Sequence, residues 1–251
     1  MSSDHFFAQP GDVKIGPPSG VQSLGAADKT TPVAGNSGPP RLIRRRRRII
    51  LAIAGALAIS AVGVAAWSFG LRDRFVPKRF GVVVPGEIYR SGQISRALLG
   101  QVIDRYHIGT IVDLNGFDPS DRDQQAEVTI CQSKGVQHDV FPLKGNGTGK
   151  IERYADAIAT VVHSQQNGIP ALVHCYAGTQ RTGGFVSFYR LLIRHERPED
   201  VYAELGRYGW DSGTDQVLLE YINSNMPTLA ELLVQRHVLD QLPAEIPRLH
   251  P

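Results

Sequence analysis

The chain is poor in cysteine, with only Cys131 and Cys175 among its 251 residues. A disulfide framework needs several cysteine pairs, and a zinc site needs a cluster of cysteine or histidine ligands. The sequence therefore predicts neither. Cys131 falls in a predicted helix and is expected to be an inert packing residue, although oxidation outside the cytoplasm would allow it to bond to Cys175.

The larger part of the chain also lacks a net positive charge. The formal net charge is +3, but residues 1–48 hold eight Lys and Arg against three Asp and Glu, which leaves 19 basic and 21 acidic residues in the remainder. Nucleic-acid binding depends on concentrated positive charge. We therefore expect no nucleic-acid partner.

The first 40 residues contain no apolar periodicity. They include six glycines, six prolines and five serines, so they cannot bury a core and are expected to be disordered. An arginine block follows at 44–48. We assign residues 1–48 to a disordered tail with a basic end.

Residues 49–69 carry no charge over 21 positions. A helix of this length measures about 31 Å at ~1.5 Å per residue, close to the ~30 Å hydrocarbon core of a bilayer. The segment is predicted to be a transmembrane helix, with residues 70–77 as a short stalk. The membrane lipid bilayer is therefore an expected partner.

Two other interpretations of this segment are a buried core helix and a cleaved export signal. A buried core helix would show a polar face and would not follow five arginines. A cleaved export signal is compatible with the small residues Val64 and Ala66, but the apolar run is longer than usual for such signals. We favour an uncleaved anchor.

Basic residues set the expected orientation. Six lie before the apolar segment, at 41 and 44–48, and four lie after it, at 72, 74, 78 and 79. The excess keeps the amino end in the cytoplasm. We therefore expect a single-pass protein of the cell membrane with residues 78–251 outside the cytoplasm.

From residue 78 onward, apolar strand patterns alternate with helical patterns, which predicts an α/β domain with a mostly parallel central sheet flanked by helices. Strands are expected at 110–114, 136–143 and 171–174, and helices at 95–107, 121–134, 151–162, 181–195 and 197–205. Two closing helices are expected at 217–222 and 229–239, before an irregular tail after Leu242. Binding sites of such sheets lie at the carboxyl ends of the strands.

The run HCYAGTQRTG at 174–183 lies where a predicted strand turns into a helix. Free backbone N–H groups at a helix start favour a bound anion, and the same field lowers the pKa of Cys175. Arg181 offers a planar pair of donors to a phosphoryl group, and Thr182 can donate its hydroxyl to the sulfur. We predict that Cys175, Arg181 and Thr182 are catalytic.

The rest of the run is expected to cradle the phosphate. The predicted phosphate-binding residues are Tyr176, Ala177, Gly178, Thr179, Gln180 and Arg181, with glycine allowing a tight curl of the backbone. His174 is expected to support the loop through hydrogen bonds and to help stabilise the thiolate. We do not expect it to act as a general base.

This run resembles the HCxxGxxR(S/T)G signature of cysteine-dependent phosphatases of the protein-tyrosine and dual-specificity type. The segment GEIYRSGQ at 86–93 is similar to a strand of bacterial and fungal atypical dual-specificity phosphatases, and 109–114 and 197–205 are similar to later elements. The resemblance covers about residues 79–210. It implies the fold of these phosphatases, a phosphocysteine intermediate, no metal and no cofactor, with Tyr89 and Arg90 bracing the sheet near the loop.

The general acid is missing from its usual place. The family usually carries an aspartate in the loop after the strand that ends here near Leu143, but residues 144–150 contain no carboxylate. Gln180 stands where some relatives have another aspartate, and Asp139 is expected to be too far away. The remaining candidates are Asp113, Asp118, Asp121 and Asp123.

The expected substrate is a phosphorylated protein, such as one with phosphotyrosine, or a small phosphomonoester. Relatives that attack inositol polyphosphates carry Lys or His between the cysteine and the arginine, which this loop lacks; Lys144 and Lys150 are the nearest cations in the sequence. Phospholipid or inositol phosphate hydrolysis remains an alternative. A catalytically weak phosphopeptide binder is another.

Overall fold

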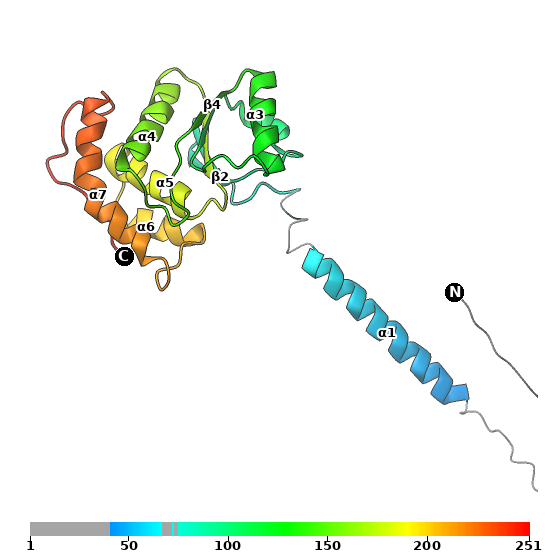
Figure 1. The fold of residues 1–251 in the computed structure, drawn as a ribbon. Coiled ribbons are helices and arrows are strands. Elements are labelled where there is room, and N and C mark those ends of the chain that lie inside the picture. The colour runs from blue at the N-terminus through cyan, green and yellow to red at the C-terminus, as the bar shows by residue number, and fades with distance from the viewer. Residues whose placement is uncertain (1–40, 67–71, 73–74) are drawn as a thin grey trace, which may run out of the picture. The chain divides into compact units, whose positions relative to one another are not determined.

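The computed structural model describes residues 41–66, 72 and 75–251 (Figure 1). The predicted disorder of residues 1–40 and much of the predicted stalk lie outside the described residues.

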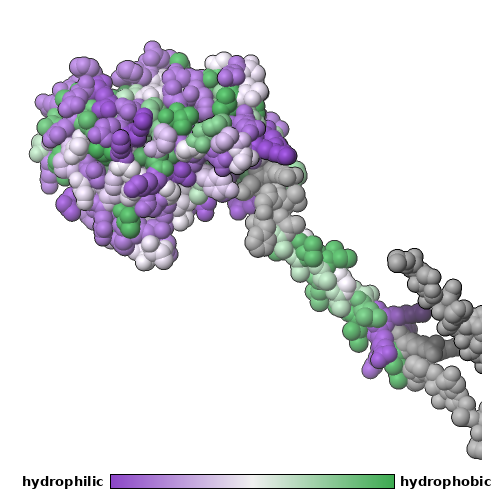
Figure 2. Space-filling model, viewed as in Figure 1, coloured by the Kyte–Doolittle hydropathy of each residue, from purple (hydrophilic) through white to green (hydrophobic). Residues whose placement is uncertain are grey.

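Helix α1 (Arg41–Ala66) covers most of the expected membrane segment. It starts at Arg41 rather than Ile49, because arginine is a good helix former; residues 67–69 lie outside the described residues. Residues 45–65 are long and apolar enough to cross a membrane, and none of this window is buried. Figure 2 shows these apolar side chains on the surface of the helix. That exposure argues against the core-helix alternative.

The central sheet has five strands: β1 (Gly81–Val84), β2 (Ile88–Gly92), β3 (Thr110–Asp113), β4 (Gln137–Val140) and β5 (Ala171–Cys175). Their order is β1-β2-β5-β3-β4. Only β1 and β2 pair antiparallel, whereas β2 with β5, β5 with β3 and β3 with β4 are parallel. The prediction of a mostly parallel sheet is confirmed, but the hairpin strand β1 was not predicted.

Six helices of this domain flank the sheet: α2 (Leu99–Tyr106), α3 (Arg122–Lys134), α4 (Ile151–Gln166), α5 (Gln180–Leu192), α6 (Pro198–Arg207) and α7 (Gln216–Gln235). Strand side chains alternate between two hydrophobic clusters. Ile111 and Leu172 pack with α2 and α3, whereas Val112 and Val173 pack with the other four helices. Helices therefore cover both faces, as predicted (Figure 1).

The prediction of two closing helices was wrong. One continuous helix, α7, runs through Pro227. Its buried residues fall on one face on both sides of the proline: Leu218, Ile222, Met226, Leu229 and Leu233. This shared packing outweighs the backbone hydrogen bond that the proline removes.

Candidate active site

The loop between β5 and α5 carries the predicted nucleophile. Strand β5 ends at Cys175 and α5 begins at Gln180. Between them Gly178 has φ 77°, and a Cβ at this position would lie 2.5 Å from the backbone nitrogen of Gly92. Only glycine fits this close approach of two backbones. The curl turns the Gly178 N–H toward the sulfur of Cys175, at 3.2 Å.

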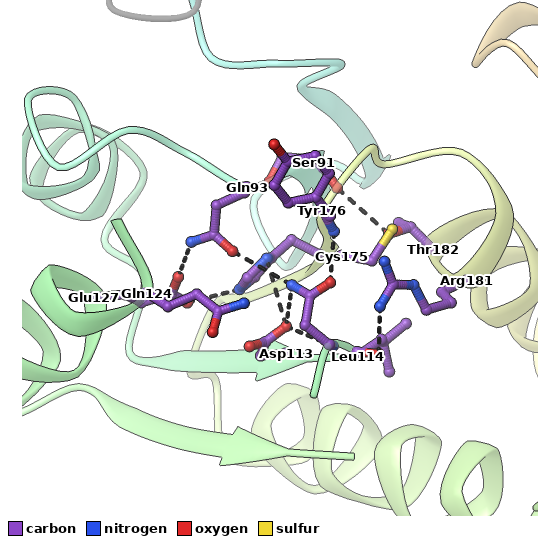
Figure 3. Close-up of polar contacts among 12 residues, drawn as sticks. Ser91, Gln93, Asp113, Leu114, Gln124, Glu127, Cys175, Tyr176, Arg181 and Thr182 are labelled. Carbon is purple, nitrogen blue, oxygen red and sulfur yellow. Dashed lines mark hydrogen bonds and ion pairs between the residues drawn. The ribbon is translucent and has the colours of Figure 1, made fainter. Parts of the chain in front are cut away.

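The surroundings of Cys175 favour the thiolate. The residue is 1% exposed, and burial alone would raise the pKa of its thiol. The hydrogen bond from Thr182, the charge of Arg181 and the backbone N–H groups of Thr182 and Gly178 outweigh burial and hold the pKa below its ordinary value. The structure thus brings the three predicted catalytic residues together (Figure 3).

Arg181 is only partly satisfied by the protein. Its Nη1 donates to the carbonyl of Leu114 at 3.5 Å, and its buried Nε has no hydrogen-bond partner among the described residues. A partly buried guanidinium with spare donors is suited to a bidentate oxyanion. The Thr182 hydroxyl also contacts the carbonyl of Ser91, at 3.4 Å.

Some of the predicted cradle residues bond to neighbouring segments, and others offer free backbone N–H groups. The N–H of Tyr176 donates to Asn115 Oδ1 at 2.7 Å, and the Thr179 hydroxyl donates to the carbonyl of Tyr208 at 3.1 Å. These two bonds hold the loop to its neighbours. Gln180 lies in the first turn of α5, where backbone N–H groups have no partner within the helix.

Two basic residues lie close to the loop in the structure, and the sequence analysis did not predict this contact. Arg79 Nη1 donates to the carbonyl of Ala177 at 2.9 Å, and Lys78 Nζ lies 4.8 Å from the ring centre of Tyr176. Both lie nearly a hundred residues upstream of the loop, so no local pattern could reveal the contact. They add cations to the rim of the loop.

A buried ion pair braces the loop from the side of β2. Arg90 is fully buried, donates to Glu204 and to the carbonyl of Gly178, each at 3.1 Å, and packs on the ring of Tyr208. The resemblance implied this bracing role for Arg90. Tyr89 instead packs in the cluster of α2 and α3, next to Phe80.

The predicted acid candidates are mostly occupied in local structure. Asp121 caps α3, the carboxylate of Asp118 accepts hydrogen bonds from Ser120, and the other candidates bond elsewhere. Asp123 accepts from the N–H of Arg96, and Asp113 accepts from Asn115. Asp139, which was expected to be too far away, accepts from Gln137. None of these contacts points to a leaving-group acid.

Sequence reasoning missed a buried polar network behind the loop. It contains Gln93, Asn115 and Glu127, which come from three separate segments, together with the predicted supporting residue His174. Burial disfavours the imidazolium, but the carboxylates of Glu127 and Asp113 raise the pKa of His174 to about 10. His174 is therefore charged at neutral pH, which supports its expected role in stabilising the thiolate.

The two cysteines are not partners in the structure. Both are free, and they belong to different hydrophobic clusters, Cys131 with α2 and α3 and Cys175 with the other helices. Burial raises the pKa of Cys131 to about 12. Cys131 is thus a packing residue, as expected.

Comparison with known proteins supports the phosphatase resemblance. No family model matches the chain. A probable dual specificity protein phosphatase H1 homolog of fowlpox virus is 38% identical over 55 residues, which cover 22% of this chain and 33% of the viral protein. The match therefore spans about a third of that relative.

Solved structures match at low identity. TpbA of P. aeruginosa is 17% identical with a TM-score of 0.51, covering 64% of this chain and 91% of its own. The Siw14 catalytic core is 18% identical with a TM-score of 0.52, covering 65% and 94%. The core catalytic domain of the PP-IP phosphatase SIW14 of S. cerevisiae is 20% identical with a TM-score of 0.50, covering 62% and 92%. The chain shares the fold of these solved structures, one of which is the catalytic domain of a phosphatase.

Proposed function

We propose that this protein is a membrane-anchored, cysteine-dependent phosphatase that hydrolyses phosphate monoesters. The observation that carries the proposal is the loop around Cys175, where the Gly178 N–H and the Thr182 hydroxyl contact a buried sulfur beside Arg181. A simple phosphate binder has no use for an acidic thiol. The viral phosphatase relative and the shared fold support the same class.

The reaction follows from these groups. The Cys175 thiolate attacks phosphorus, so that an S–P bond forms and the P–O bond to the leaving group breaks. Arg181 binds two equatorial oxygens throughout, which stabilises their charge in the transition state. Water then attacks the phosphocysteine, and the sulfur leaves as a thiolate that the Thr182 hydroxyl stabilises.

Phosphotyrosine or another phosphoprotein is the proposed substrate. The described aspartates near the loop are engaged elsewhere, so the leaving oxygen receives little help from an acid. Phenolate leaves more easily than an alkoxide without protonation. Aryl phosphates should therefore react best.

Inositol phosphates and phospholipid headgroups are the second candidate class. Arg79 and Lys78 place two cations beside the loop, where a substrate with several phosphates would need them. A PP-IP phosphatase shares the fold. Comparing a phosphotyrosine peptide with an inositol polyphosphate as substrate separates the two classes.

We also propose that α1 anchors the protein in the cell membrane, with its amino end in the cytoplasm and the phosphatase domain outside. The apolar, uncovered window of α1 and the excess of basic residues before it support this topology. A reporter that is active only outside the cytoplasm, fused after Pro251, should be active. Activity of a cytoplasm-only reporter instead would reverse the orientation.

The function is tested with the full-length chain in detergent under reducing conditions. The wild type should release p-nitrophenol from p-nitrophenyl phosphate, Cys175→Ser should release none, and the matched control Cys131→Ser should stay active. A folded wild type that binds phosphate without hydrolysing this ester would be a binder, and the proposal would be wrong.

A further inference from the structure

The two residues that flank Cys175 are each held by a side chain from elsewhere in the fold. His174 Nε2 lies 2.6 Å from Glu127 Oε1, and the N–H of Tyr176 donates to Asn115 Oδ1 at 2.7 Å. Figure 3 shows Glu127, on α3, at one side of the loop and Arg181 at the other. Hydrogen bonds therefore hold the residues on both sides of Cys175 in the sequence.

Both of these connections end on the same carboxylate. Asn115 Nδ2 donates to Gln93 Oε1 at 3.3 Å, and Gln93 Nε2 donates to the second oxygen of Glu127. We propose that Glu127 is a positioning residue for Cys175, because its two oxygens fix His174 directly and Tyr176 through Gln93 and Asn115. The proposal rests on the proposed function, since it concerns how the same loop is aligned.

The chemistry of Glu127 sets the direction of the bonds that Gln93 makes in this network. A carboxylate can only accept, so Gln93 must turn its NH2 group toward Glu127 and its oxygen toward Asn115. Asn115 must then point its NH2 group at Gln93 and its oxygen at the N–H of Tyr176. Glu127 thereby orients the amide of Gln93, whereas Asp113 also holds the amide of Asn115 in the same orientation by accepting from its Nδ2 at 2.7 Å.

The same carboxylate keeps His174 charged. Burial opposes ionisation of both groups, but their contact lowers the pKa of Glu127 well below its ordinary range and raises that of His174 to about 10. Asp113 Oδ1 lies 3.8 Å from His174 Nδ1, and His138 Nε2 lies 3.4 Å from Glu127 Oε1. Cys175 also interacts electrostatically with His174. An imidazolium therefore adjoins the thiolate.

Two substitutions separate alignment from charge. Glutamine at 127 has one acceptor oxygen and one NH2 group, so it can still receive the bond from Gln93 but offers His174 a donor. The pKa of His174 then falls, because only Asp113 remains to raise it, and the positive charge beside Cys175 is weakened. Alanine at 127 removes both the alignment and the charge.

The test uses the full-length chain in detergent with Cys131→Ala as the parent, which leaves Cys175 as the single thiol. The pH profile of iodoacetamide alkylation measures the thiol pKa, and protection by tungstate measures oxyanion binding. Thermal unfolding shows whether each variant is folded. None of these readouts requires turnover.

In Glu127→Gln the alkylation midpoint should rise by about one pH unit because the positive charge of His174 is weakened, while tungstate protection changes little. In Glu127→Ala the midpoint should rise as well, and tungstate protection should weaken by about tenfold or more because the loop is misaligned. If Glu127→Ala does not fold, Glu127→Gln decides alone.

Folded variants that keep the parental alkylation profile and tungstate affinity would overturn the proposal. Failure of both variants to fold would overturn it too, because Glu127 would then stabilise the domain rather than the loop. If the variants show the expected shifts but the parent hydrolyses no ester, the proposed function alone would be refuted.

Discussion

Arg181 is the residue on which the proposed reaction depends most after the nucleophile. Its guanidinium lies beside Cys175 with a buried Nε that has no partner in the described part of the chain. In Arg181→Lys the planar pair of donors becomes a single ammonium, so kcat/KM for p-nitrophenyl phosphate should fall about a hundredfold.

Steady-state kinetics checks this prediction, with the exposed arginine of α3 substituted in the same way, Arg122→Lys, as a control. The control should keep wild-type values. An Arg181→Lys enzyme within about threefold of the wild type would mean that bidentate binding is unimportant.

The buried pair of His174 and Glu127 predicts how stability depends on pH. The pKa of His174 rises from its ordinary value of 6.5 to about 10 in the folded chain. A raised pKa means that the stabilisation is fully present below pH 6.5 and is lost as the pH rises toward 10. The free energy of unfolding should therefore contain a component that declines across this window.

Denaturant unfolding at a series of pH values measures that component. In His174→Gln the decline between pH 6.5 and 10 should be smaller than in the wild type, because the titrating group is gone. Parallel curves for the two proteins would show that His174 is not charged in the folded state.

At the scale of elements, the curl between β5 and α5 depends on one glycine. A Cβ at Gly178 would lie 2.5 Å from the Gly92 nitrogen and 2.8 Å from the Ser91 carbonyl carbon, and φ is 77°. Gly178→Ala should therefore cost on the order of 1–3 kcal/mol of stability and displace the loop from the sulfur. Activity should fall more than stability explains.

Chemical denaturation and kinetics measure both effects. Gly116→Ala, in the loop after β3, is the matched control, because a Cβ there meets nothing within 4 Å. It should leave both properties close to wild type. Equal behaviour of the two variants would contradict the role of the curl.

The sequence predicted those elements whose signals are local. The alternation of strands and helices and the loop at Cys175 are encoded within short segments, so both could be recognised without a structure. The continuous helix across Pro227 could not, because a local rule for proline was overridden by packing along α7.

The long-range contacts of the site could not be predicted from the sequence either. In the sequence, Glu127 is one of several polar residues of a helix, and nothing distinguishes it. Only the packing of α3 on the sheet brings it to His174. The contact of Arg79 with Ala177 joins residues 98 positions apart. Nothing in the periodicity of either segment marks such pairs.

At the scale of the whole molecule, the engagement of the described aspartates in other hydrogen bonds should set the range of substrates. For a series of aryl and alkyl phosphates, kcat/KM should fall steeply as the pKa of the leaving group rises. Asp118→Asn should change the rates little, because Ser120 already binds this carboxylate and lowers its pKa.

Values of kcat/KM measured across the series show whether an acid protonates the leaving oxygen. A flat dependence on the leaving group would show that a carboxylate protonates the leaving oxygen. A large loss in Asp118→Asn confined to poor leaving groups would identify that acid as Asp118.

The central claim is that Cys175 becomes covalently phosphorylated during turnover. The most direct measurement is to quench the full-length enzyme with acid during hydrolysis of p-nitrophenyl phosphate and to locate phosphate in its peptides by mass spectrometry. We predict phosphate on Cys175 in the wild type and none in Cys175→Ser. Hydrolysis without phosphate on Cys175, or with phosphate on another residue, would contradict the account.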